Sequence, residues 1–130
     1  MTLRRVVLDT SVLVSGLLGG SSVPVLRRWR RGEFELVVSP EIYAEYEAVL
    51  TRPKFGLPTS LVRELLAFIR VQAHWVEPDI HLNIVRDTSD DKFLEAAVSG
   101  EAGIIVSSDR DLLDLGEVRG ISIVPPWEFV

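Results

Sequence analysis

The stretch RVVLDTSVL, residues 5–13, gives the clearest indication of the fold. Its apolar run at 6–8 is short and β-branched, which is typical of a buried strand. Asp9 closes that run, and residues 11–18 continue with apolar side chains at helical spacing. A strand that ends in an acid and leads into a helix is expected at the edge of an open α/β sheet, where such sheets bind ligands.

The alternation of strand and helix continues along the chain. Further strands are predicted at 35–38, 75–77, 104–106 and 121–124. Further helices are predicted at about 23–32, 40–50, 59–72, 90–100 and 109–113. The polar stretch 78–89 is expected to be irregular. This order predicts an α/β, three-layer fold with a mostly parallel central sheet flanked by helices, and one domain over residues 1–130.

The composition places the chain in a broad class. Its 130 residues include 47% apolar and 25% charged residues, which is ordinary for a soluble globular protein. The absence of cysteine excludes a disulfide framework and a thiolate zinc site. The first residues, MTLRR, run directly into a strand, so no signal peptide is expected, and no apolar run approaches membrane-spanning length. The expected location is the cytoplasm.

Four acids stand where the sequence pattern changes from one element to the next, namely Asp9, Glu45, Asp90 and Asp109. Strand ends and helix starts of this kind tend to meet at one edge of the sheet. Two like charges 4 Å apart near a protein surface repel by roughly 4 kcal/mol. Such a cluster either takes up a proton or holds a hard divalent cation. The second solution indicates metal-dependent phosphate chemistry.

The net charge is compatible with that chemistry. A formal charge of −5 at first argues against a nucleic-acid partner. Removing the four charges of the acids from −5 leaves −1 for the rest of the chain. Net charge therefore does not exclude a polyanionic substrate.

Each of the four acids also has a structural interpretation. Glu45 lies roughly 40° outside the apolar stripe of its helix, so it can be a surface glutamate. Asp90 projects over the apolar side of its helix, as either an N-cap or a ligand. Asp109 precedes a short helix that it can cap. Asp9 has the weakest structural explanation, because an aspartate between a strand and a small polar pair is seldom needed for structure.

Two further groups of polar residues have two readings each. Ser11 and Ser107 can hydrogen-bond the carboxylates or metal-bound waters, or they can act as caps. His74 and His81 lie in a polar region away from the acids, which favours surface or structural roles over ligation.

The run RRWRR at 27–31 resembles a basic patch with an aromatic residue inside it. Trp29 lies three residues after Leu26, which indicates that it packs and that the arginines form a solvated face. The alternative is contact with RNA or a partner, for which the guanidinium fork suits phosphate. The candidate RNA contacts are Arg27, Arg28, Arg30 and Arg31.

Taken together, these motifs resemble the PIN-domain family of metal-dependent ribonucleases over essentially the whole chain. The family begins with an apolar strand ending in Asp, as VLDTSVL does at 7–13. A serine and a glutamate six residues apart follow, here Ser39 and Glu45. A loop-to-helix aspartate comes next, in DTSDDKF at 87–93, and then a strand followed by Ser-x-Asp, in SSDRDLL at 107–113. The resemblance is closest to the VapC-like toxins of VapBC-type toxin–antitoxin pairs.

The chain departs from the family pattern at two positions. Ser11 stands where many members carry Asn, and Ser107 replaces Thr, but both keep a hydrogen-bonding group. The third acidic position can be filled by Asp87, Asp90 or Asp91. We assign it to Asp90 because this residue faces the apolar side of its helix.

The resemblance implies a doubly wound α/β fold, Mg²⁺ or Mn²⁺, and endonucleolytic cleavage of RNA. It also implies a homodimer and a small neutralising antitoxin as partners. Asp9, Glu45, Asp90 and Asp109 are then the catalytic and metal-binding residues, supported by Ser11 and Ser107. In such sites the cations orient the scissile phosphate, activate a water and stabilise the leaving oxygen.

Three other functions fit parts of the pattern. A phosphoaspartyl phosphatase needs a second aspartate at position 11, where this chain has serine. A phosphoacceptor receiver domain needs a lysine after a late strand, and no lysine follows Lys92. A catalytically inactive PIN-fold module that binds protein or RNA is the remaining alternative, and it is opposed by the intact set of acids.

Overall fold

The first strand of the chain lies inside the sheet. The strands are β1 (Arg5–Leu8), β2 (Glu35–Val38), β3 (His74–Trp75), β4 (Ile104–Val106), β5 (Glu117–Val118) and β6 (Ile121–Val124). In the computed structural model, which describes residues 3–129, they form one sheet in the order β3-β2-β1-β4-β6-β5. All neighbouring strands are parallel except β5 and β6. The predicted mostly parallel sheet is therefore confirmed.

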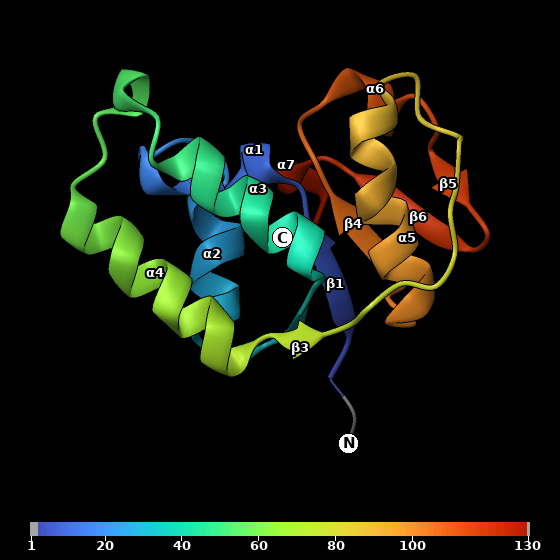
Figure 1. Ribbon diagram of the computed structural model, residues 1–130, viewed down its shortest axis with the longest axis horizontal. Coiled ribbons are helices and arrows are strands. Elements are labelled where there is room, and N and C mark those ends of the chain that lie inside the picture. Colours follow the sequence, from blue (N-terminus) through green and yellow to red (C-terminus); the bar gives the residue numbers. More distant parts are fainter. Residues whose placement is uncertain (1–2, 130) are drawn as a thin grey trace.

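Helices flank this sheet (Figure 1). The α-helices are α1 (Thr10–Leu17), α2 (Val23–Arg30), α3 (Pro40–Leu50), α4 (Thr59–Gln72), α5 (Asp91–Ser99), α6 (Arg110–Leu113) and α7 (Pro126–Phe129). Two 3₁₀ turns are η1 (Pro53–Phe55) and η2 (Thr88–Asp90). Helix α5 contacts β1, β2 and β4, α4 contacts β2, and α1 lies against α2 and α3. The predicted α/β class with flanking helices is confirmed, and no helix in residues 3–129 has the length and apolar character to cross a membrane.

The connections create a switch point at the centre of the sheet. From β1 the chain moves outward to β2 and β3, and it then returns to β4 on the other side of β1. The carboxyl ends of β1 and β4 are joined by a hydrogen bond of 2.9 Å from the Asp9 amide to the Val106 carbonyl. Ligand sites of open α/β sheets lie at such a point.

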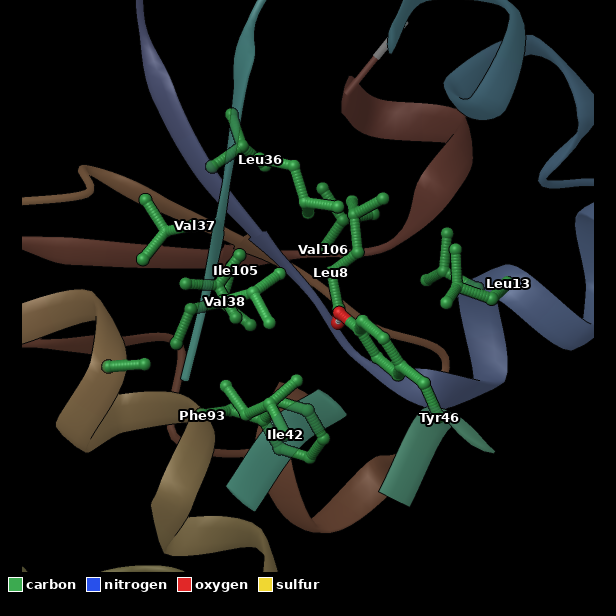
Figure 2. Packing of buried hydrophobic residues seen from close by; sticks show 14 of the residues in the cluster. Leu8, Leu13, Leu36, Val37, Val38, Ile42, Tyr46, Phe93, Ile105 and Val106 are labelled. Atoms are coloured by element: carbon green, nitrogen blue, oxygen red, sulfur yellow. Dashed lines mark hydrogen bonds between the residues drawn. The ribbon is translucent and has the colours of Figure 1, made fainter. Parts of the chain in front are cut away.

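The core ties α3 and α5 to the strands beside this switch point. Tyr46 of α3 and Phe93 of α5 are completely buried. Figure 2 shows the Tyr46 ring reaching towards Leu8, whose carbonyl oxygen accepts a hydrogen bond of 2.5 Å from the tyrosine hydroxyl. Because the buried carbonyl at the strand end then has a partner, α3 is held against the end of β1.

Several short elements differ from the sequence-based predictions. The stretch predicted as irregular ends in η2, so that α5 begins at Asp91 rather than at Asp90. Strand β5 was not predicted, because its turn into β6 uses Arg119 at a φ of 52° before Gly120 and lacks the usual Asn-Gly signal. Helix α7 was also not predicted, although it begins at Pro126 and proline favours the first turn of a helix.

Candidate active site

Asp9 is a buried acid that does not cap a helix. It occupies the position before α1, but its side chain makes no capping hydrogen bond, and only 5% of its surface is exposed. Its Oδ2 accepts hydrogen bonds from the hydroxyls of Ser11, at 2.9 Å, and Ser107, at 2.7 Å. Burial raises the pKa of Asp9, the two serines lower it, and the charges of Asp109 and Glu45 raise it further. The carboxyl is therefore positioned beside other acids.

Ser107 links the ends of β1 and β4. While its hydroxyl donates to Asp9, its oxygen accepts a hydrogen bond of 2.9 Å from the Asp109 amide. Asp109 itself caps α6, with its Oδ1 accepting a hydrogen bond of 2.9 Å from the Asp111 amide. The capping interpretation of Asp109 thus holds, and the same fold places its carboxyl near those of Asp9 and Asp90.

Asp90 has the most perturbed carboxyl of the site. It precedes α5 without making a capping hydrogen bond, and it is 7% exposed. Burial, a hydrogen bond with the Asp109 carboxyl, and the charges of Asp9, Asp109 and Asp87 raise the pKa of Asp90 to about 7. Its Oδ2 is buried and has no hydrogen-bond partner in the described part of the chain. A buried acid placed next to other acids without a cap function is characteristic of a functional site.

Glu45 lies near Asp9 and is paired with a cation. Its Oε1 is 2.7 Å from the Lys92 ammonium, and its Oε2 accepts a hydrogen bond from the Thr10 hydroxyl. Its charge contributes to the raised pKa of Asp9. Glu45 is therefore half-buried and directed inwards, rather than a solvated surface residue.

Sequence reasoning missed Lys92 as a member of this group. The Lys92 side chain is 8% exposed, and its ammonium also donates to the Ser89 carbonyl. A lysine in the first turn of a helix lies against the positive end of the helix dipole, which is unfavourable without a compensating anion. That position at the start of α5, two residues after Asp90, is the signal that could have identified it.

The two alternative acids of this region have structural roles. Asp91 is 4% exposed, and its Oδ1 accepts hydrogen bonds from the amides of Ile84, at 3.0 Å, and Val85, at 2.9 Å. Asp87 is exposed and caps η2 by accepting from the amide and the hydroxyl of Ser89, which lowers the pKa of Asp87. The Asp91 carboxylate is thus turned inwards by two backbone donors, and Asp90 remains the acid assigned to the site.

The basic run divides into residues with different surroundings. Trp29 is buried and packs edge-on against Phe68, with 5.0 Å between the ring centroids. Arg28 donates to Glu33 at 3.0 Å and to the Phe129 carbonyl at 3.1 Å. Arg31 lies 3.9 Å from Glu33 and is exposed. The two other arginines are also exposed and line a pocket of about 370 Å³ between α1, α2 and α4; these are Arg27 and Arg30.

Carboxylate oxygens are suitable ligands for a hard divalent cation, but the four side chains are not arranged as a coordination shell. No three acidic or histidine side chains within residues 3–129 stand together as a ligand set. Asp9, Glu45 and Asp109 are each turned towards a neutral donor or a cation, as expected where carboxylates repel one another. The donors are nevertheless all oxygens, the charges are mutually coupled, and Asp90 offers a buried oxygen without a partner. Mg²⁺ and Mn²⁺ prefer such ligands.

Comparison with known proteins places this site in a family context. A sequence model described as "PIN domain" matches residues 5–111, a range that contains all four acids. The chain is also similar to uncharacterized protein MJ1680 of Methanocaldococcus jannaschii, with 30% identity over 117 residues, which cover 85% of this chain and 74% of the relative. PIN domains are typically nucleases that bind RNA and generally use a divalent metal. The span of the match, together with the acids gathered at the ends of β1 and β4, shows that the chain belongs to the PIN-domain family.

Proposed function

We propose that the protein is a divalent-metal-dependent endoribonuclease that uses Mg²⁺ or Mn²⁺. Asp9, Asp90 and Asp109, together with Glu45, are the acids of its site. The observation that carries the proposal is Asp90, a buried acid with a pKa of about 7 and an oxygen without a partner. Its environment is unfavourable for a structural carboxylate, and a divalent cation would relieve it.

Each residue of the site has its own role in the proposed reaction. Ser11 and Ser107 hold Asp9 in one orientation by both donating to Oδ2, which leaves Oδ1 free of these two hydrogen bonds. Asp109 is fixed by its cap on α6, and Asp90 by its burial at the start of α5. The bound cation supplies charge to orient the scissile phosphate and to lower the pKa of water. Glu45 is held by Thr10 and Lys92, and its charge acts on Asp9.

The decisive experiment is cleavage of a labelled RNA that contains single-stranded loops. We expect cleavage with Mg²⁺ or Mn²⁺, none with EDTA, and a loss of at least a hundredfold in Asp90→Asn and Glu45→Gln. Asp87→Asn is the matched control, since Asp87 is an exposed cap, and it should retain near wild-type activity. If Asp90→Asn and wild type cleave equally, the assignment of the site is wrong.

We extend the proposal to a biological role as the toxin of a toxin–antitoxin pair, acting as a homodimer. The support is the resemblance of the acidic motifs to VapC-like toxins. Induced expression should arrest growth, and Asp9→Asn should abolish the arrest. A small neighbouring gene should encode a protein that neutralises the toxin, and light scattering should give a dimer mass. Growth unaffected by the wild-type protein would remove the toxin role and leave the nuclease proposal in place.

One observation favours a second candidate, an inactive PIN-fold module that binds RNA or protein. Lys92 already neutralises Glu45, as a cation in an inactive site would do. This function is supported if the purified protein binds RNA or a partner tightly but cleaves no RNA at any Mn²⁺ concentration.

A further inference from the structure

Lys92 is a buried cation inside the acidic site. Its ammonium lies 2.7 Å from Glu45 Oε1 and donates to the Ser89 carbonyl, while its side chain is 8% exposed. Only two lysines occur in the chain, and the other one, Lys54, is exposed in η1. A charge that is this far removed from water needs its partner, because breaking a buried ion pair leaves an uncompensated charge.

By the contacts of their side chains the acids form two halves, although the charge of Glu45 also raises the pKa of Asp9. In the first, Asp90 shares a hydrogen bond with Asp109, and both are coupled to Asp9 by charge. The buried oxygen without a partner, Oδ2 of Asp90, belongs to this half. In the second half, both oxygens of Glu45 are engaged, one by Lys92 and the other by Thr10.

A metal ion that bound Glu45 would be repelled by the Lys92 ammonium. Mg²⁺ binds carboxylate oxygen at about 2.0–2.1 Å. An ion on Glu45 Oε1 would lie within about 5 Å of the Lys92 nitrogen, given the 2.7 Å ion pair. Two cations at that separation repel strongly in a site shielded from water. The Lys92 ammonium is held by a backbone carbonyl as well, so it cannot simply swing away.

We propose that Lys92 is a positioning residue that takes the place of a second metal ion: its ion pair holds the Glu45 side chain in place, and the site binds one divalent cation, at Asp9, Asp90 and Asp109. The inference rests on the proposed metal-dependent function and deepens it. It makes Glu45 a neighbour of the cation rather than its ligand.

The test is a count of Mn²⁺ ions per chain by calorimetric titration, together with the Mn²⁺ electron paramagnetic resonance spectrum. Wild type should bind one ion and give the six-line spectrum of an isolated Mn²⁺. Lys92→Met removes the charge with a side chain of similar length, and it should bind two ions with an exchange-coupled spectrum. Lys92→Arg keeps the charge and should bind one, and Lys54→Met is the matched control, which should also bind one.

Two variants of Glu45 complete the design. Glu45→Gln/Lys92→Met should return to one ion, because the second ion needs the Glu45 carboxylate. Glu45→Gln alone should change the Mn²⁺ dissociation constant less than about threefold, whereas Asp90→Asn should weaken it at least tenfold. This comparison decides the question even where a Lys92 variant does not fold.

Different results would contradict the role of Lys92 and the metal-dependent function. Two ions in wild type, one ion in Lys92→Met, or an equal loss in Glu45→Gln and Asp90→Asn each overturn the role of Lys92 while metal dependence stands. No Mn²⁺ binding by wild type at millimolar concentration overturns the metal-dependent function and the Lys92 role with it.

Discussion

Asp90 shows how one residue can link the fold to its proposed chemistry. Its carboxyl is buried, bonded to the Asp109 carboxyl and surrounded by like charge, which raises the pKa of Asp90 to about 7. In an unfolded chain the same carboxyl has an ordinary pKa of about 3.9. The folded state therefore binds a proton that the unfolded state releases, over the range between these two values.

The first prediction concerns the stability of the metal-free protein. In the folded state the pKa of Asp90 is raised to about 7. The contribution of Asp90 to the free energy of unfolding is therefore fully present below about pH 4 and is lost as pH rises through about 7. Between pH 5 and pH 8 the free energy of unfolding of wild type should fall by about 1–2 kcal/mol relative to that of Asp90→Asn, after allowance for screening by water. Urea unfolding in EDTA at the two pH values measures this difference. A constant difference would show that Asp90 does not titrate in this range.

The second prediction concerns Asp9. Because burial and like charge raise the pKa of Asp9, replacing its charge should stabilise the metal-free fold. The Asn oxygen can still accept from Ser11 and Ser107. We expect Asp9→Asn to melt a few degrees higher in EDTA and to bind Mn²⁺ at least tenfold more weakly. Asp79→Asn, at an exposed position, is the control and should change neither. A lower melting temperature together with unchanged Mn²⁺ affinity would make Asp9 a structural residue.

At the scale of elements, α5 does more than cover the sheet. Asp91 at its first turn binds the amides of Ile84 and Val85, and Glu95 one turn later accepts a hydrogen bond of 2.9 Å from the Leu82 amide. The irregular segment before η2 is thereby held along the outside of α5, as the yellow trace in Figure 1 shows. Two acids on one helix thus anchor the chain that leads to Asp90.

The third prediction tests this anchoring. Asp91→Ala leaves two backbone amides without their acceptor, one of them in a buried hydrogen bond, and should cost about 2–3 kcal/mol of stability. Amide exchange at residues 84 and 85 should accelerate, while Mn²⁺ affinity falls less than tenfold. Asp87→Ala removes only an exposed cap and should lower stability much less than Asp91→Ala does. Loss of Mn²⁺ binding in a folded Asp91→Ala protein would make Asp91 a ligand.

At the scale of the whole molecule, acids and arginines occupy different parts of the protein. The acids gather at the ends of β1 and β4, whereas the exposed arginines lie on α2, beside a pocket shared with α1 and α4. The overall charge of −5 therefore conceals a basic surface. A nuclease of this charge would hold its polyanionic substrate through such a surface and through its metal.

The fourth prediction concerns RNA binding. Arg28 is committed to Glu33 and to the Phe129 carbonyl, and Arg31 lies 3.9 Å from Glu33. Of the arginines that line the pocket, Arg27 and Arg30 have no acidic partner in the described part of the chain, so they are the first candidates for phosphate contacts. We expect Arg27→Ala/Arg30→Ala to weaken binding of single-stranded RNA and to lower the salt slope by about 1–2, with Mn²⁺ affinity unchanged. Arg28→Ala should instead lower stability. Fluorescence anisotropy at several salt concentrations provides the measurement, and an unchanged slope would leave the arginines as a solvated face.

The sequence by itself determined the order of the main elements and the α/β class. Apolar runs such as 6–8 and 104–106 identify strands by short-range pattern, and a serine followed by proline at 39–40 marks a helix start. The short elements β5, α7 and η2 escaped prediction because they depend on single turns and pairings rather than on periodicity.

The candidate site was accessible from the sequence only as a set of acids at element boundaries. Which of three neighbouring aspartates faces the others was decided by tertiary structure: Asp91 turns to backbone amides, Asp87 caps a turn, and Asp90 is left beside Asp109. The pairing of Lys92 with Glu45 joins residues 47 positions apart, and no local pattern encodes their distance. The pKa of Asp90 likewise arises from burial and from charges that only the assembled sheet edge brings together.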